Sequence, residues 1–135
     1  FLSLEPLVDA VTLRAHDDGH GLGRQRDLVF GHCPTHDRGI GYVCSCPKRN
    51  GVSWVIVGGE SGGGARSFDL GWALDLVNEC EQGEAACFVK QLGAFAVMGH
   101  GTVEAEPFPL KHRSGADPSE WPADLRVREF PEVQR

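Results

Sequence analysis

A glycine-rich segment after residue 57 carries three side chains that could do chemistry. The apolar run 54–57 leads directly into a turn that contains a carboxylate (Glu60), a hydroxyl (Ser61) and a guanidinium (Arg66). A tight turn does not need an acidic side chain, because Gly, Asn and Asp alone can build one. Glu60 therefore indicates a site, and the alternative is a solvated loop. The glycines that would let a ligand approach the main chain are Gly58, Gly59 and Gly62.

Two more charged residues follow predicted strands in the same way. Glu5 ends the segment Phe1-Leu-Ser-Leu, and Lys90 ends the segment 86–90. In α/β proteins, ligands bind outside the carboxyl ends of parallel strands. We expect Glu5, Glu60 and Lys90 to be catalytic residues at this edge, where they could transfer protons, orient an amine and a carboxylate, or neutralise a phosphate. The alternative is that either carboxylate forms a structural ion pair with Lys90 or Arg66.

The middle of the chain holds side chains of the types that bind zinc. Cys33, His36, Cys44 and Cys46 lie close together in the sequence, next to His32. Their spacings do not reproduce the usual zinc knuckles, so zinc is the weaker of two interpretations and surface residues the stronger. We expect Cys80 and Cys87, in contrast, to be small buried hydrophobic residues.

The elements that position these residues follow from the apolar pattern. The run Trp54-Val-Ile-Val predicts a buried strand, and Ala86-Cys-Phe-Val-Lys predicts another. Between them, Asp69 can cap a helix that ends at Gly83. The apolar stripe of this helix consists of Leu70, Ala73, Leu74, Val77 and Cys80. The segment 54–91 is therefore a βαβ unit with parallel strands and a right-handed crossover.

The rest of the chain is less regular. Pro6 stops the first strand, since proline cannot donate to a strand ladder. Residues 8–50 show little periodicity and predict an irregular excursion. Prolines interrupt residues 94–135, which predicts an extended tail with one helical turn at 118–125. The tail residues expected to pack on the body are Trp121, Leu125 and Phe130.

Length, charge and composition narrow the class of protein. A chain of 135 residues with 41% hydrophobic residues suits one domain, residues 1–135. The net charge of −6 argues against a general nucleic-acid-binding surface. Five cysteines in no compact pattern predict reduced thiols. No apolar run reaches the roughly 20 residues that span a bilayer, so we predict a cytoplasmic protein with no membrane partner. Because the chain starts at Phe1 within a strand pattern, we expect further residues before it.

Four ordered strings resemble one known family. They are Phe1-Leu-Ser-Leu-Glu-Pro-Leu7, Trp54-Val-Ile-Val-Gly-Gly-Glu-Ser-Gly62 with Gly64-Ala-Arg66, Phe88-Val-Lys-Gln-Leu-Gly93, and Asp117-Pro-Ser-Glu-Trp-Pro-Ala-Asp-Leu-Arg-Val-Arg-Glu-Phe-Pro131. Together they resemble the carboxyl-terminal half of the bacteriophage gp-thirty-seven/sixty-eight type family, found in bacteria, phages and prophages and uncharacterised in function. The resemblance covers most of the chain apart from its middle.

That family looks like a distant relative of radical S-adenosylmethionine enzymes, with a partial (β/α) barrel and a three-cysteine motif in its amino-terminal half. The resemblance implies a barrel mouth lined by Glu5, the turn from Gly58 to Gly62, Arg66, Lys90 and Gln91. The motif would lie before Phe1, and none of Cys33, Cys44 and Cys46 corresponds to it. The resemblance therefore implies that this chain alone holds no iron–sulfur cluster, whereas the intact parent would bind a cluster and S-adenosylmethionine.

The sequence therefore predicts an α/β protein, a partial (β/α) barrel fragment with parallel strands and a proline-rich tail. Its expected partner is the amino-terminal half of the same protein, and its ligand a small molecule or nucleotide. The resemblance implies a parent that is a radical S-adenosylmethionine-like enzyme acting on a nucleotide or nucleic acid. The alternatives are a non-catalytic binding or regulatory module that docks a partner on an exposed strand edge, and an inactive remnant.

Overall fold

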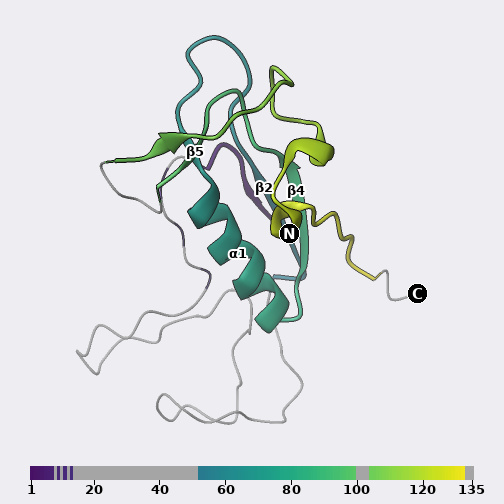
Figure 1. The fold of residues 1–135 in the computed structure, drawn as a ribbon. Coiled ribbons are helices and arrows are strands. Elements are labelled where there is room, and N and C mark those ends of the chain that lie inside the picture. The colour runs from purple at the N-terminus through teal and green to yellow at the C-terminus, as the bar shows by residue number, and fades with distance from the viewer. Residues whose placement is uncertain (8, 10, 12, 14–51, 100–103, 133–135) are drawn as a thin grey trace, which may run out of the picture.

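The computed structural model describes residues 1–7, 9, 11, 13, 52–99 and 104–132. Three strands, β1 (Leu2–Leu4), β2 (Trp54–Gly58) and β4 (Ala86–Gln91), form a parallel sheet in the order β1-β2-β4. Figure 1 shows this sheet beside the helix α1 (Leu70–Gln82). The predicted α/β class, its parallel strands and its crossover helix are confirmed.

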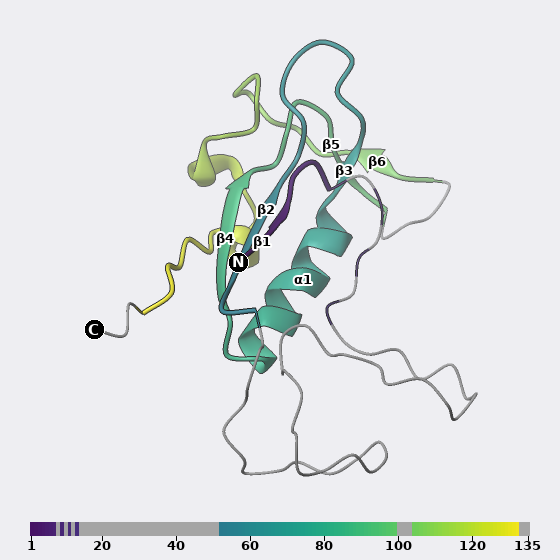
Figure 2. The ribbon, with the colours of Figure 1, turned by 180° about the vertical axis from the view of Figure 1, so that it is seen from behind.

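One face of this sheet is buried. Val55 and Val57 on β2 lie in register with Cys87 and Val89 on β4, and all four are at most 2% exposed. β-branched and other apolar side chains at alternate positions give a strand one continuous apolar face, and burying it is the main stabilising contribution. Helix α1 packs against β4, and it lies alongside the sheet in the front view and in the view from behind (Figures 1 and 2).

Helix α1 begins and ends where the sequence predicts. The Asp69 carboxylate accepts a hydrogen bond of 2.8 Å from the Gly71 backbone N–H, and Gly83 closes the other end with its N–H on the Glu79 carbonyl. The buried stripe differs slightly from the prediction. Leu76 is fully buried, whereas Leu74 and Val77 are only half-buried because they lie to one side of the face that meets the sheet.

The carboxyl-terminal region contains more structure than the predicted extended tail. A second sheet has the order β3-β5-β6 and consists of β3 (Phe68–Asp69), β5 (Ala96–Met98) and β6 (Glu106–Pro107). The helical turn predicted at 118–125 is two 3₁₀ turns, η1 (Pro118–Glu120) and η2 (Ala123–Leu125). The prediction failed here because strands of two or three residues are too short to show a period and form only by pairing with neighbours.

The end of the tail covers the outer edge of β4. The Val89 N–H donates to the Val127 carbonyl (2.9 Å), and the Glu129 N–H donates to the Cys87 carbonyl (2.8 Å). Trp121 and Leu125 are buried as predicted, but Phe130 remains 68% exposed and only contacts the rings of Trp54 and Phe88. Arg128 adds a guanidinium 5.4 Å from the Phe88 ring centroid.

The strands of the described residues form two separate sheets and no closed barrel. The predicted barrel fragment and the single domain over residues 1–135 both stay predictions. The excursion at 8–50 falls almost wholly outside the residues that the structure describes, although Leu13 is one of the buried core residues. Among the described ranges, no helix is long and apolar enough to cross a membrane.

Removing the cap of α1 should destabilise the fold. Asp69→Ala deletes the acceptor for the Gly71 N–H, and losing an N-cap costs about 0.5–2 kcal/mol. Urea denaturation followed by circular dichroism should show this loss. Asp69→Asn keeps a side-chain oxygen and should retain most of the stability, so equal destabilisation by both variants would contradict a capping role.

Candidate functional site

Glu60 and Arg66 form a bidentate ion pair at the carboxyl end of β2. The Arg66 Nε lies 3.1 Å from both carboxylate oxygens of Glu60, and its Nη2 donates to Oε1. The Arg66 backbone N–H donates to Oε2 at 2.8 Å. The loop between them thus returns onto the carboxylate that begins it. Arg66 is the more accessible partner, with a side chain 60% exposed against 27% for Glu60.

The same contacts fix the charge of the pair. Hydrogen bonds from the Arg66 side chain and then from its backbone N–H lower the pKa of Glu60 from 4.5 to about 2. The pKa of Arg66 is raised by the same side-chain hydrogen bond. Glu60 is therefore an anion at neutral pH, suited to binding a cation or accepting hydrogen bonds. It is poorly suited to donating a proton while this pair is intact.

Glu5 and Lys90 form a second, looser pair at the ends of β1 and β4. The Lys90 Nζ lies 3.3 Å from Oε1 and 3.4 Å from Oε2 of Glu5, and their side chains are 54% and 26% exposed. The Ser3 hydroxyl also reaches Glu5, at 3.5 Å. Residues 85 positions apart thus meet because parallel strands end at the same edge.

The structure brings the predicted residues together as two pairs rather than as one triad. Glu5 contacts Lys90 and Glu60 contacts Arg66, and no contact described joins one pair to the other in the ranges that the structure covers. Ser61 and Gly62 lie in the exposed part of the loop, where Gly62 has a φ of +109° and open space around it. Ion pairs of these carboxylates with Lys90 and Arg66 are the structural alternative to a catalytic role. Exposed ion pairs of this kind contribute little to stability, so an incoming ligand could replace either partner.

Gly58 and Gly59 are close to protein atoms. A Cβ atom on Gly58 would lie 2.7 Å from the Glu5 Oε1, and one on Gly59 would lie 2.6 Å from the Leu92 carbonyl oxygen. Gln91 reinforces this approach, because its Nε2 donates to the Gly59 carbonyl at 2.9 Å. These two glycines and Gln91 therefore hold the turn against β4. Space for a ligand lies instead around residues 62–64, where added Cβ atoms would meet nothing within 4 Å.

The loop between β6 and η1, residues 108–117, lies at the same end and was not among the predicted site residues. Its Gly115 carbonyl accepts from the Leu92 N–H (3.0 Å), and Gly115 packs on Gly93. The loop carries His112, whose Nδ1 accepts from the Ser114 and Ala116 N–H groups (3.4 and 3.3 Å). Figure 2 shows the connections after β2, β4 and β6 gathered at one end of the molecule. The run Lys111-His112-Arg113 beside Gly115 is the sequence signal that could have indicated it.

The described residues include no group of three side chains that could hold a metal ion. The zinc alternative at Cys33, His36, Cys44 and Cys46 lies outside the described residues. Cys80 and Cys87 are free, buried thiols on the helix side of the sheet, which confirms their prediction as core residues. They lie away from the charged edge and do not fit an iron–sulfur cluster there.

Parallel strands joined through a crossover helix, with charged pairs at their carboxyl ends, define a mixed α/β protein. The chain belongs to the DUF5131 family, described as a protein of unknown function, whose model matches residues 1–122. Searches of curated proteins and of solved structures find no match.

The Glu60–Arg66 pair should respond to acid in a defined direction. Because the folded pKa of about 2 lies below the ordinary 4.5, the pair contributes stability that is fully present above pH 4.5 and lost as the pH falls towards 2. NMR titration of the Glu60 carboxyl carbon should give a midpoint near 2, moving towards 4.5 in Arg66→Gln. Arg113→Gln, which removes an exposed loop arginine, should leave it unchanged. A midpoint near 4.5 in the wild type would contradict the pairing.

The glycines of the turn should differ sharply in tolerance. Gly59→Ala places a methyl group against the Leu92 carbonyl and should cost about 1–3 kcal/mol, as overpacking does. Gly63→Ala meets open space and should be neutral or stabilising by up to about 1 kcal/mol. Chemical denaturation of both variants checks this. Equal effects would show that the approach of residue 59 to residue 92 is not a constraint.

Proposed function

We propose that this protein is part of a (β/α) barrel enzyme of the radical S-adenosylmethionine-like type, which binds a small polar ligand at the carboxyl edge of its parallel sheet. The observation that carries the proposal is that two accessible ion pairs lie at the ends of three adjacent parallel strands. These ion pairs are Glu5–Lys90 and Glu60–Arg66. Such edges are where α/β enzymes bind substrates. The resemblance to the bacteriophage gp-thirty-seven/sixty-eight type family supports the same class.

The two faces and two edges of the sheet support a barrel that continues beyond β1. Parallel sheets are normally covered on both faces, but here Ser3 is exposed and Ile56 and Phe88 are only half-buried on the face opposite the buried valines. Residues 127–129 cover the edge of β4, whereas within the described residues no strand pairs with the outer edge of β1. We place the amino-terminal half of the barrel at that edge, in a cytoplasmic protein.

The charges suggest what the ligand carries. Glu5 and Glu60 would bind a positively charged amine, and Lys90 and Arg66 would contact a carboxylate or a phosphate. A zwitterion such as the amino-acid end of S-adenosylmethionine has both groups, and a nucleotide has the anionic one. Each protein charge already has an opposite partner, so a ligand with both signs can exchange with the pairs without leaving a charge unpaired. The guanidinium of Arg66 is geometrically suited to a bidentate anion.

The charged residues of this edge are not ligands of an iron–sulfur cluster, and the two described cysteines lie elsewhere. Cys80 lies on the buried face of α1 and Cys87 on β4, and both thiols are in the core rather than at the strand-end edge. The role derived for this chain is therefore to bind and orient a charged ligand.

Ligand binding should raise the melting temperature. A ligand at ten times its Kd stabilises the folded state by about 1.4 kcal/mol, which is roughly 5 °C for a chain of this size. The 135-residue chain should be melted with S-adenosylmethionine and, separately, with nucleoside mono- and triphosphates. Glu60→Gln and Lys90→Ala should each reduce the shift produced by whichever ligand binds. Glu106→Gln, which changes an exposed carboxylate on β6, should leave that shift unchanged. No shift with any of these ligands would contradict the proposal.

A non-catalytic binding or regulatory module is the second candidate. The outer edge of β1, which no strand among the described residues pairs with, favours it, because an unpaired strand edge can accept a strand from another protein. An inactive remnant is the third candidate. The melting experiment separates the enzyme from both, since neither alternative requires binding of a small charged ligand.

A further inference from the structure

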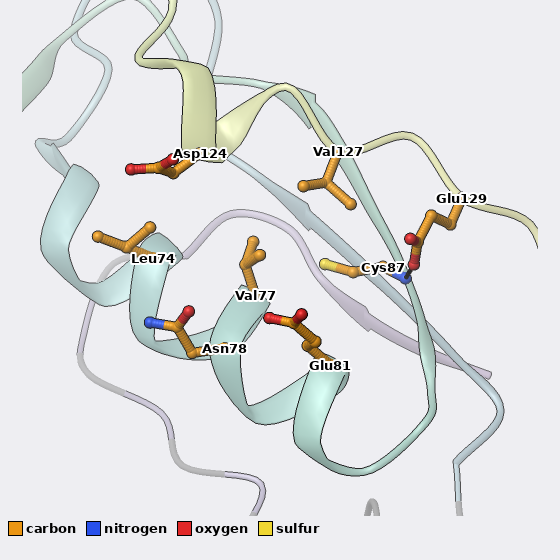
Figure 3. A pocket seen from close by; sticks show the side chains of 8 residues that line it. All are labelled: Leu74, Val77, Asn78, Glu81, Cys87, Asp124, Val127 and Glu129. Atoms are coloured by element: carbon orange, nitrogen blue, oxygen red, sulfur yellow. Dashed lines mark hydrogen bonds between the residues drawn. The ribbon is translucent and has the colours of Figure 1, made fainter.

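A groove on the helix side of the molecule is not used by the strand-end site. It has a volume of about 440 Å³, within the range of roughly 300–1,000 Å³ for small-molecule sites, and lies between α1 and the segment from η2 to Glu129 (Figure 3). Its floor is apolar. Leu74 and Val77 come from one face of α1, Val127 from the opposite wall, and Cys87 from β4 between them.

The thiol in this floor is neutral. A hydrogen bond with Cys80 raises the pKa of Cys87 strongly, and burial and the nearby charge of Glu129 raise it further. The thiol therefore stays protonated and adds to the apolar surface. Leu74, Val77 and Val127 are only half-buried, so the groove exposes apolar area that a ligand could cover.

The walls and rim of the groove carry charge of one sign. Glu81 on α1, Asp124 on η2 and Glu129 beyond it contribute three carboxylates, and no lysine or arginine is among the lining residues. Glu81 and Asp124 form no ion pair with any residue that the structure describes. The Glu129 Oε2 accepts the Cys87 backbone N–H at 3.1 Å, which holds that carboxylate at the groove.

We propose that this groove binds a linear aliphatic polyamine. Methylene segments would cover the apolar floor formed by Leu74, Val77 and Val127, as the stems of lysine side chains do on protein surfaces. Ammonium groups would meet the carboxylates of Glu81, Asp124 and Glu129 in the walls. A compact metal cation would leave the apolar floor uncovered, and an anion would be repelled. The complementary charge and the apolar floor together thus select a cation with an alkyl body.

The proposal can be tested by calorimetric titration of the full chain with spermidine. Glu81→Gln combined with Asp124→Asn should weaken binding about ten-fold, because two ion pairs with the ammonium groups are lost. The matched control is Glu104→Gln with Glu106→Gln, which changes the net charge equally on exposed residues of another region and should alter the affinity less than two-fold. Thermal melts should show that both double variants fold.

Other results would overturn the proposal. Equal binding of Mg²⁺ at the same charge concentration, or equal weakening by the control variant, would show a diffuse response to the negative charge of the protein. Binding of a lysine-rich peptide without binding of spermidine would identify a protein partner instead. No heat with spermidine at millimolar concentration, confirmed by unchanged NMR signals of Val77 and Val127, would exclude the site. Because the groove and the strand-end edge share no residue, either proposal can fail alone.

Discussion

The arrangement of the candidate site depends on three stretches of backbone that approach one another without side chains between them. Gly59 packs on the Leu92 carbonyl, Gly93 on the Glu60 carbonyl, and Gly115 on the Gly93 carbonyl. Hydrogen bonds continue the pairing of β2 and β4 past the ends of the strands, from the Gly59 N–H to Gln91 and from the Ala94 N–H to Glu60. Any larger residue at these positions would separate the loops. The charged side chains are therefore presented by a rigid base even though they are themselves accessible.

The sequence was sufficient to predict the elements that have a clear period. The apolar runs at β2 and β4, and the cap and length of α1, are local signals, and parallel pairing follows from the crossover between the strands. The strands β3, β5 and β6 are different because their existence depends on partners distant in the chain. Phe68, for example, donates its N–H to the Phe95 carbonyl, a contact that no local pattern encodes.

The edge of the site was predictable, but its internal pairing was not. Parallel topology alone places Glu5, Glu60 and Lys90 at one end of the sheet. Which carboxylate meets which cation depends on the path of the loop, and here the loop returns Arg66 to Glu60 and leaves Lys90 to Glu5. Glycine at positions 58 and 59 is ambiguous for the same reason. Absence of a side chain suits a ligand and a neighbouring backbone equally, and only the three-dimensional structure shows that Glu5 and Leu92 lie there.

The cover over the edge of β4 has a consequence for relatives of this protein. The family model matches residues 1–122, whereas the residues that pair with β4 are Val127 and Glu129. The matched region therefore includes β4 and ends before the segment that covers its edge in this chain. A family member with another sequence after the matched region would have to cover the same row of backbone groups by different means, since a bare edge promotes aggregation. In this chain, loss of residues 127–129 would leave those groups of β4 free to pair with a strand of another molecule.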